Sequence, residues 1–226
     1  MPAALYPKRS DMEYRTRTHS GRNRTHMKQY LLCAVCEQRF DHSGESEVLQ
    51  RIAAKKRSSF PLQERMRLAL PIEEHPTISI FAGDRLGFDM DKFAYFALSL
   101  VWRGAVARWN MPGGETTSLL QIGEFEQPIR MFLLGEAPFP PETTVIVIVQ
   151  GNATARDGIS IPPGVSKSGF LDFGFLARGV YFRTVMGPNV PTELRNACCT
   201  SARKSIFYGD GERELLESLA PLAPMA

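Results

Sequence analysis

The sequence contains no long apolar segment and little cysteine, and each shortage excludes a class of protein. The most hydrophobic helical stretch, Phe93 to Trp102, is too short to cross a bilayer, which takes about 20 apolar residues. Residues 1–30 contain no apolar core of the length that a secretory signal needs. Four cysteines in a chain of 226 residues without such a signal are more typical of thiols or metal ligands than of disulfides. We therefore expect a cytoplasmic protein with no membrane partner.

The sequence also lacks the short motifs of several enzyme classes. It contains no P-loop, no dinucleotide-binding fingerprint, no Gly-x-Ser-x-Gly and no His-Glu-x-x-His. No internal repeat or low-complexity tract is visible. Motifs of this kind therefore assign no reaction to the chain.

The order of hydrophobic patterns predicts an α+β fold. The first half favours helices: one after a Ser43 cap, one between Pro61 and Pro71, a long one over 91–109 and a short one over 124–134. The second half favours strands: a buried one over 143–150, a hairpin over 170–185 and a last strand over 205–208 before a terminal helix over 212–219. We expect a mainly antiparallel sheet to follow the central helices.

The basic residues are concentrated at the N-terminus. Residues 1–30 contain seven basic and two acidic side chains, a net charge of +5, whereas the other 196 residues sum to −2. A basic arm on a near-neutral body favours binding to an anionic polymer, and DNA is the predicted partner, although a solvated tail without a partner explains the charge too. The predicted nucleic-acid-binding residues are Arg15, Arg17, Arg22, Arg24 and Lys28.

Cys33 and Cys36 are the most distinctive chemical feature. Their C-x-x-C spacing brings two thiolates within about 2.3 Å of one metal ion, but a structural zinc takes four ligands. His26 and His42 are the predicted further ligands, with His19 as a third option. Two alternatives stay open: inert thiols, and redox chemistry of the thioredoxin type, which would need a helix N-terminus after a parallel strand. Cys198 and Cys199 are interpreted as buried small residues.

The segment Leu31-Leu32-Cys33-Ala34-Val35-Cys36-Glu37-Gln38-Arg39-Phe40, followed by Glu45 and Glu47, resembles a family of uncharacterised bacterial proteins. In that family such a segment forms the second half of a metal knuckle like that of HNH endonucleases. The resemblance continues through 96–103, 123–125 and 130–135. It implies a small zinc-knuckle-like segment, zinc as cofactor and association with nucleic acid.

The chain departs from that family in one respect. Such proteins open with an earlier C-x-x-C and a Ser-His-x-x-Pro segment, whose His resembles the catalytic His of HNH nucleases, and neither precedes Cys33 here. We therefore predict an incomplete knuckle. The predicted organisation is a flexible basic arm over 1–29, half of a knuckle plus a helix over 30–60, and an α+β domain over 61–226.

Two further groups of charged residues allow both functional and structural interpretations. Arg103 and Arg108 on the long helix are either paired charges at the edge of the core or phosphate contacts beside the arm. Glu45 and Glu47 either tune a metal or are solvated carboxylates near a helix start, and Glu37 is a further candidate to ligate or tune the metal.

Three hypotheses about function follow. The first is a nucleic-acid-associated protein that is catalytically incomplete. The second is a metal-dependent nuclease in which His19 or His26 serves as the base. The third is a non-catalytic module whose β-rich half, residues 143–208, binds a protein partner.

Overall fold

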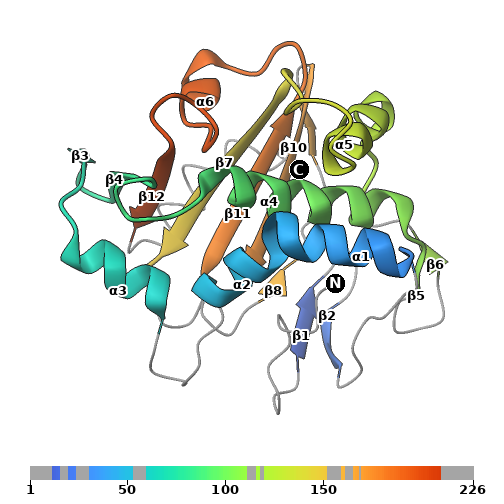
Figure 1. The fold of residues 1–226 in the computed structure, drawn as a ribbon, viewed down its shortest axis with the longest axis horizontal. Coiled ribbons are helices and arrows are strands. Elements are labelled where there is room, and N and C mark those ends of the chain that lie inside the picture. Colours follow the sequence, from blue (N-terminus) through green and yellow to red (C-terminus); the bar gives the residue numbers. More distant parts are fainter. Residues whose placement is uncertain are drawn as a thin grey trace.

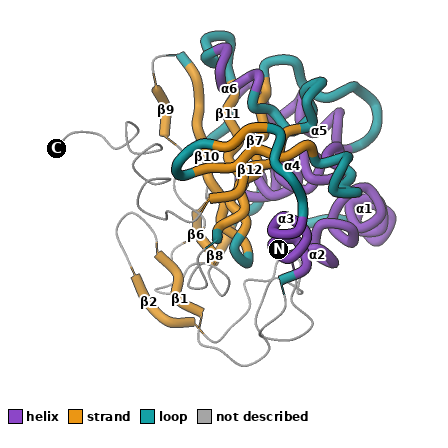
Figure 2. The backbone as a smooth tube through the Cα atoms, turned by 90° about the vertical axis from the view of Figure 1, so that its left-hand side faces the viewer, coloured by secondary structure: helices purple, strands orange, loops and turns teal. Residues whose placement is uncertain are grey.

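A layer of helices covers one face of an open, mostly antiparallel sheet, so the fold is α+β as the sequence predicts (Figures 1 and 2). The computed structural model describes residues 12–15, 20–23, 31–52, 60–110, 116–117, 120–151, 159–160, 165–167 and 169–209. The predicted terminal helix over 212–219 lies outside this part of the chain.

The helices are α1 (Ala34–Phe40), the π-turn η2 (Asp41–Glu45), α2 (Ser46–Ile52), α3 (Pro61–Leu68), α4 (Met90–Val106), the short 3-10 helix η3 (Gly123–Phe125), α5 (Glu126–Leu133) and α6 (Thr192–Asn196). The strands are β1 (Met12–Arg15), β2 (Ser20–Asn23), β3 (Glu73–Glu74), β4 (Ile78–Ala82), β5 (Trp109–Asn110), β6 (Thr116–Thr117), β7 (Thr143–Gln150), β8 (Ile159–Ser160), β9 (Val165–Lys167), β10 (Phe170–Ala177), β11 (Val180–Met186) and β12 (Ser205–Gly209).

The main sheet has the order β3-β4-β12-β7-β11-β10-β8, with β9 also paired to β10. Within it, β12 and β7 are the parallel pair, and the other pairings are antiparallel. Strand β12 thus lies between β4 and β7, although these three strands are far apart in the sequence (Figure 1). This arrangement places β7 near the middle of the sheet.

Strand β7 is buried along its whole length, as its continuous apolar run predicts. Val145, Val147 and Val149 belong to the main core under the helices. Ile146 and Ile148 point to the other face, where they pack with side chains that include Leu194, Ala197, Tyr181 and Phe207. The five central positions, 145–149, are all apolar because both faces of this strand exclude water.

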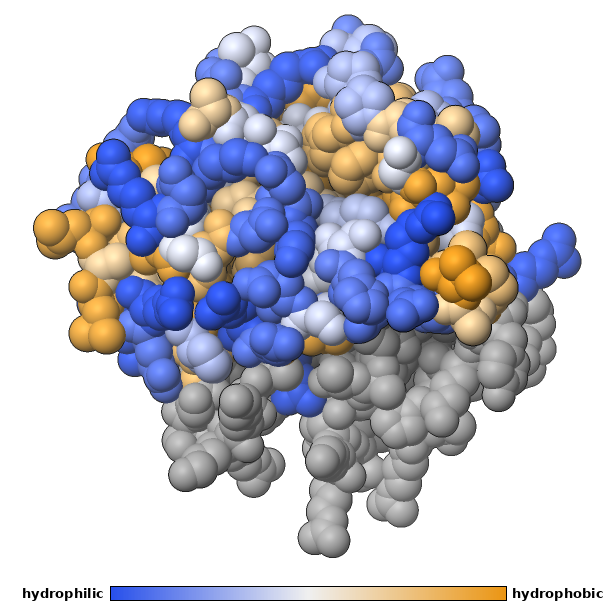
Figure 3. Space-filling view, in the orientation of Figure 1, coloured by the Kyte–Doolittle hydropathy of each residue, from blue (hydrophilic) through white to orange (hydrophobic). Residues whose placement is uncertain are grey.

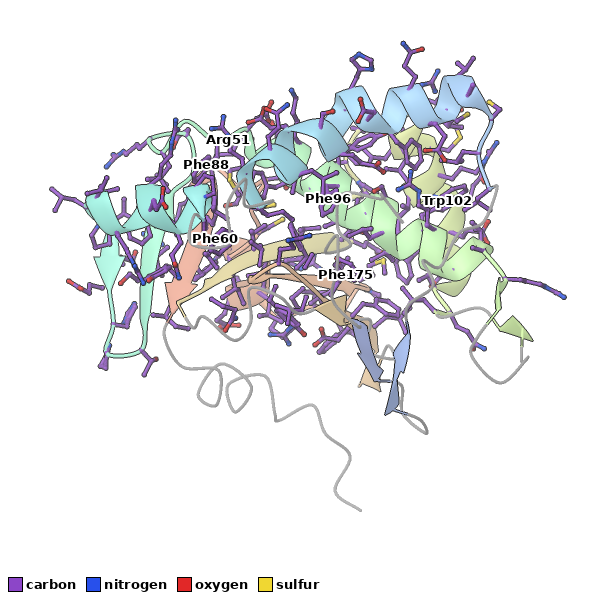
Figure 4. The ribbon with its side chains drawn as sticks, turned by 90° about the horizontal axis from the view of Figure 1, so that it is seen from below. Arg51, Phe60, Phe88, Phe96, Trp102 and Phe175 are labelled. Atoms are coloured by element: carbon purple, nitrogen blue, oxygen red, sulfur yellow. The ribbon has the colours of Figure 1, made fainter. Side chains whose placement is uncertain are left out.

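Helix α4 is the central helix, and its start agrees with the sequence-based prediction. The Asp89 carboxylate accepts hydrogen bonds from the backbone N–H groups of Asp91 and Lys92, at 3.1 and 3.2 Å, which satisfies two donors that an uncapped helix would leave free. Phe93 and Phe96 then pack against Phe182 of β11, with ring centroids 6.4 and 5.2 Å apart. Figure 4 shows Phe96 between α4 and the sheet.

The predicted hairpin forms around Arg178 and Gly179, whose φ angles are +49° and +80°. Two consecutive positive φ angles are typical of the two-residue turn that matches the twist of the flanking strands. Ala177 is paired with Val180 across it, which sets the register of β10 and β11. The prediction of this hairpin is confirmed.

The segment around the cysteines differs from the prediction. The sequence predicts a turn between Cys33 and Cys36 and a helix capped by Ser43, and this is wrong: the chain is helical without a break from Ala34 to Ile52. The π-turn at its centre widens one turn of the helix, which leaves Phe40 and Glu45 facing α4 together. Ser43 therefore lies within a helix instead of at its start.

The basic arm contains one element that the sequence analysis does not predict. Residues 12–15 and 20–23 form an antiparallel ladder in which Met12 lies opposite Asn23 and Arg15 opposite Ser20. Pairing of backbone groups requires no apolar period, so a polar hairpin of this kind leaves little signal in the sequence.

Candidate thiol and metal site

The two cysteines of the C-x-x-C motif occupy the first turn of a helix that is fixed to the core further along. Cys33 is the N-cap residue of α1, and its carbonyl accepts a hydrogen bond of 2.9 Å from the N–H of Glu37. Cys36 lies in the first turn. Cys33 and Val35 are exposed and Cys36 is half-buried, so solvent reaches the thiol pair.

The two thiols hydrogen-bond one another, and neither is part of a disulfide. Hydrogen bonds from the backbone N–H and the thiol of Cys36 lower the pKa of Cys33 below its ordinary value. The same contact raises the pKa of Cys36, because this thiol keeps the shared proton, and partial burial adds to the increase. The pair therefore releases its first proton from Cys33.

Buried contacts with α4 fix the helix behind the thiols. Phe40 is only 2% exposed and packs edge-on against Tyr95 and Trp102, with centroid distances of 5.7 and 6.2 Å. The guanidinium of Arg103 lies 4.8 Å from the centroid of the Phe40 ring. These aromatic contacts hold the helix at its seventh residue, one turn after the thiol pair.

An ion pair inside the same interface joins the π-turn to α4. Arg103 donates a hydrogen bond to the carboxylate of Glu45, and both side chains are more than nine-tenths buried. A second nitrogen of Arg103 lies 3.6 Å from the carboxylate of Glu37, which is about half exposed. Burial raises the pKa of Glu45, while Arg103 opposes that increase. Arg103 thus links the buried π-turn to the residue that follows Cys36.

The Arg103–Glu45 ion pair shows which of the two interpretations, functional or structural, is correct for each of these residues. Arg103 is a paired charge at the helix interface, in agreement with the structural alternative. Glu45 is 6% exposed, so its interpretation as a solvated helix-start carboxylate is wrong. The reason is the continuous helix from Ala34, in which Glu45 occupies an inward position instead of the first turn. Glu47 forms a partly buried i,i+4 pair with Arg51 at 2.9 Å.

The predicted metal ligands are only partly brought together. Cys33 and Cys36 are in contact, whereas the Nδ1 of His42 lies 2.8 Å from the carbonyl oxygen of Gln38, on the π-turn beyond Phe40. His26 and His19 lie outside the described residues. Within those residues, no group of three or more His, Cys, Asp or Glu side chains is arranged to hold a metal ion. Of the predicted metal ligands, the described part of the chain therefore brings only the thiols of Cys33 and Cys36 together.

The predicted DNA-binding residues belong to the arm. Arg15 ends β1 and Arg22 lies in β2, so the ladder sets their backbone positions. Arg17, Arg24 and Lys28 lie outside the part of the chain that the structure describes. The predicted interface accordingly stays a prediction.

Sequence reasoning missed two polar features of the folded body. Asp172 and Arg183 form a doubly hydrogen-bonded ion pair across β10 and β11, at 3.0 and 2.6 Å, on the sheet face opposite the helices. Cys198 and Cys199 also make specific polar contacts. The alternation of β10 and β11 indicates which residues share a face, but Asp172 and Arg183 lie diagonally across the pair, and only the register shows that they meet.

No family model, curated protein or solved structure matches this chain. Among the described residues, none of the helices combines the length and apolar character needed to cross a membrane.

Proposed function

We propose that the chain is a nucleic-acid-associated protein that keeps the two-cysteine half of an HNH-like zinc site and does not cleave its ligand by itself. The observation that supports it best is the contact between the exposed thiol of Cys33 and the half-buried thiol of Cys36, on a helix that is fixed to the core at Phe40. Two thiolates presented together on a fixed turn are half of a tetrahedral zinc site, and His26 is the predicted further donor. The +5 charge of residues 1–30 supports an anionic ligand.

Zinc at this position would be structural. It would draw residues of the arm towards α1, because a structural zinc site is filled by four protein ligands. Arg103 and Glu45 contribute by holding the helix in place against α4. Glu37, which directly follows Cys36 in the sequence, also reaches Arg103.

Zinc content tests the thiol site directly, and the chain offers a matched control. We expect about one zinc per chain in protein purified from zinc-supplemented cells, as measured by inductively coupled plasma mass spectrometry. The C33S/C36S variant should lose it, and the C198S/C199S variant, which removes the same number of thiols, should keep it. Wild-type protein without zinc, or zinc that persists in C33S/C36S, would refute the zinc site.

Salt-dependent binding to DNA tests the second half of the proposal. Fluorescence anisotropy with a short duplex should show an affinity that falls steeply with salt, and R22Q/R24Q should reduce the slope of log K against log[salt] by roughly 2. The control R85Q/R130Q removes the same charge from two exposed positions of the folded body and should leave the slope unchanged. No binding at low salt, or equal losses in both variants, would contradict the proposal even if zinc is present.

One observation favours the alternative, a protein-interaction module. Leu68 and Leu70 are 90% and 92% exposed at the end of α3, beside the edge strand β3. Figure 3 shows apolar residues on the same side of the molecule where Figure 1 places α3 and β3. Exposed apolar side chains that lie close together are typical of surfaces that bind a protein partner. A stoichiometric protein partner that binds wild-type and R22Q/R24Q alike, and that L68S/L70S loses, would support this module over nucleic acid.

A further inference from the structure

The second cysteine pair lies where three elements of the fold meet. Cys198 and Cys199 lie in the turn that follows α6, and a hydrogen bond of 2.8 Å from the N–H of Cys199 to the carbonyl of Val145 joins this turn to β7. The thiol of Cys199 reaches the carbonyl of Met90, at the first residue of α4, at 3.7 Å. The turn then leads to β12. This site is separate from the Cys33 and Cys36 pair and does not depend on the proposed function.

The sulfur of Cys198 is surrounded by hydrogen-bonding groups. The backbone N–H of Val145 donates to it at 3.4 Å, the hydroxyl of Thr200 lies at 3.2 Å, and the thiol of Cys199 is in hydrogen-bond contact. Unlike a buried thiol that only fills space, this sulfur accepts a hydrogen bond from a backbone N–H, and donors of this kind stabilise a thiolate. The same turn contains the hydroxyl of Ser201, which is buried and makes no hydrogen bond among the described residues.

The two sulfurs differ in accessibility and in charge. Cys198 is 6% exposed and Cys199 is completely buried. The hydrogen bond from Cys199 is the main cause that lowers the pKa of Cys198 to about 6, and Thr200 and Val145 add to it against the effect of burial. Burial raises the pKa of Cys199. Of the ion pair beside it, Asp91 raises this pKa further and Lys204 lowers it. The pair therefore releases its first proton from Cys198, while Cys199 keeps its own.

We propose that Cys198 and Cys199 form a peroxide-reactive dithiol, in which Cys198 is the nucleophile and Cys199 is the resolving thiol. The Cys198 thiolate attacks one oxygen of hydrogen peroxide, so that an S–O bond forms, the O–O bond breaks and the leaving hydroxide takes a proton to become water. The sulfur loses two electrons and becomes a sulfenic acid. Cys199 then attacks this sulfur, the S–O bond breaks, and the hydroxyl leaves with the Cys199 proton as a second water.

The resulting disulfide closes a small ring across one peptide bond. Neighbouring Cα atoms are about 3.8 Å apart across a trans peptide, closer than the usual range of roughly 4.4–6.8 Å for disulfides. Such a bond is strained, so dithiol reductants should reverse it readily. Its formation would also remove the contacts of Cys199 with Met90 and of Cys198 with Val145, where β7 meets the start of α4.

Oxidation of the folded protein tests this proposal. The C33S/C36S variant keeps only the second pair, and at pH 7 hydrogen peroxide should lower its intact mass by about 2 Da, with dithiothreitol restoring it. In C33S/C36S/C199A, dimedone should trap the sulfenic acid at Cys198. In C33S/C36S/C198A, dimedone should label the remaining Cys199 at least tenfold more slowly.

The pH profile separates a reactive thiolate from a thiol exposed by unfolding. Labelling of Cys198 by iodoacetamide in C33S/C36S should be half-maximal near pH 6, whereas the same protein in guanidinium chloride should show the ordinary value of about 8.5. Native labelling that follows the ordinary profile, or that requires denaturant at every pH, would overturn the proposal. Because C33S/C36S retains both buried thiols, this measurement does not depend on whether the alanine variants fold.

Discussion

At the scale of single residues, the buried Arg103–Glu45 pair joins α4 to the thiol helix, by which we mean the continuous helix over residues 34–52. Removal of one partner leaves an uncompensated charge in the core, which typically costs about 3–5 kcal/mol. R103M should therefore lower the free energy of unfolding by roughly that amount, as measured by urea denaturation followed by circular dichroism. The double variant E45Q/R103M, in which neither side chain is charged, should recover most of the loss.

The control for this prediction is an ion pair on the surface. Arg203 pairs with Glu73, and both side chains are more than a third exposed. R203Q should cost less than about 1 kcal/mol, because solvent screens exposed pairs. If R103M costs no more than R203Q, the interface is open to water and Glu45 does not fix the helix.

The raised pKa of Glu45 leads to a second prediction at this scale. The folded protein binds the proton of Glu45 more tightly than the unfolded chain does, since burial outweighs the attraction of Arg103. Its contribution to stability is therefore largest below the ordinary pKa of 4.5 and is lost as the pH rises through the higher folded-state pKa. The stability of wild-type protein relative to E45Q should fall with increasing pH over this window. A relative stability that rises instead would mean that the attraction of Arg103 outweighs burial.

At the scale of elements, Gly44 explains how closely the π-turn approaches α4. A Cβ atom at this position would lie 2.8 Å from the carbonyl oxygen of Lys92 and 3.1 Å from the backbone nitrogen of Phe96. Backbone atoms cannot move aside as a flexible side chain can, so G44A should cost roughly 1–3 kcal/mol despite the better helix propensity of alanine. Q50A, at an exposed position of α2, should change stability by less than about 0.5 kcal/mol in the same thermal denaturation series.

The elements also show what the sequence could predict. The long central helix, the buried strand β7 and the hairpin of β10 and β11 were each predicted from local sequence patterns, and the structure contains all three. The start of α1 was missed because Ser43 has a side chain that is typical of a helix cap, so the local sequence places the helix start there. Only contacts with α4 show that the helix begins almost three turns earlier, at Ala34. The parallel pairing of β12 with β7 is likewise set by tertiary packing, since no local pattern encodes which strands become neighbours.

The residues of the candidate site also divide into those that local sequence predicts and those that only tertiary packing brings together. Cys33 and Cys36 were found because their spacing alone brings two thiols together. The Arg103–Glu45 pair joins positions 58 residues apart, and Cys198 accepts a hydrogen bond from Val145 of β7, so neither contact could be derived from local sequence. Long-range partners of this kind are where sequence reasoning stops, because a polar residue looks the same whether it is solvated or buried with a partner.

At the scale of the whole molecule, one hydrophobic core includes the thiol helix. Phe40, Val48 and Ile52 belong to the same buried cluster as the residues of α4 and β7, and each is at most 2% exposed. Figure 2 shows α1 and α2 in the helical layer beside α4, and Figure 4 shows Arg51 of α2 beside Phe88, with its guanidinium 5.7 Å from the ring centroid. The segment that contains the predicted half-knuckle is therefore stabilised largely by apolar burial.

This leads to an expectation about metal removal that is opposite to that for a zinc finger, which is unfolded without its metal. Apo protein prepared with a chelator should stay folded, with the circular dichroism spectrum of the zinc-loaded form, because only the first turn of α1 lies outside the core. F40A should instead cost about 3–5 kcal/mol, since it removes a buried aromatic ring from the same helix. Zinc should slow amide hydrogen exchange at residues 33–37 and leave β7 unchanged. If chelation unfolds the whole chain, the metal is a condition of the fold, and anchoring by Phe40 and Arg103 does not explain why the thiol helix is ordered.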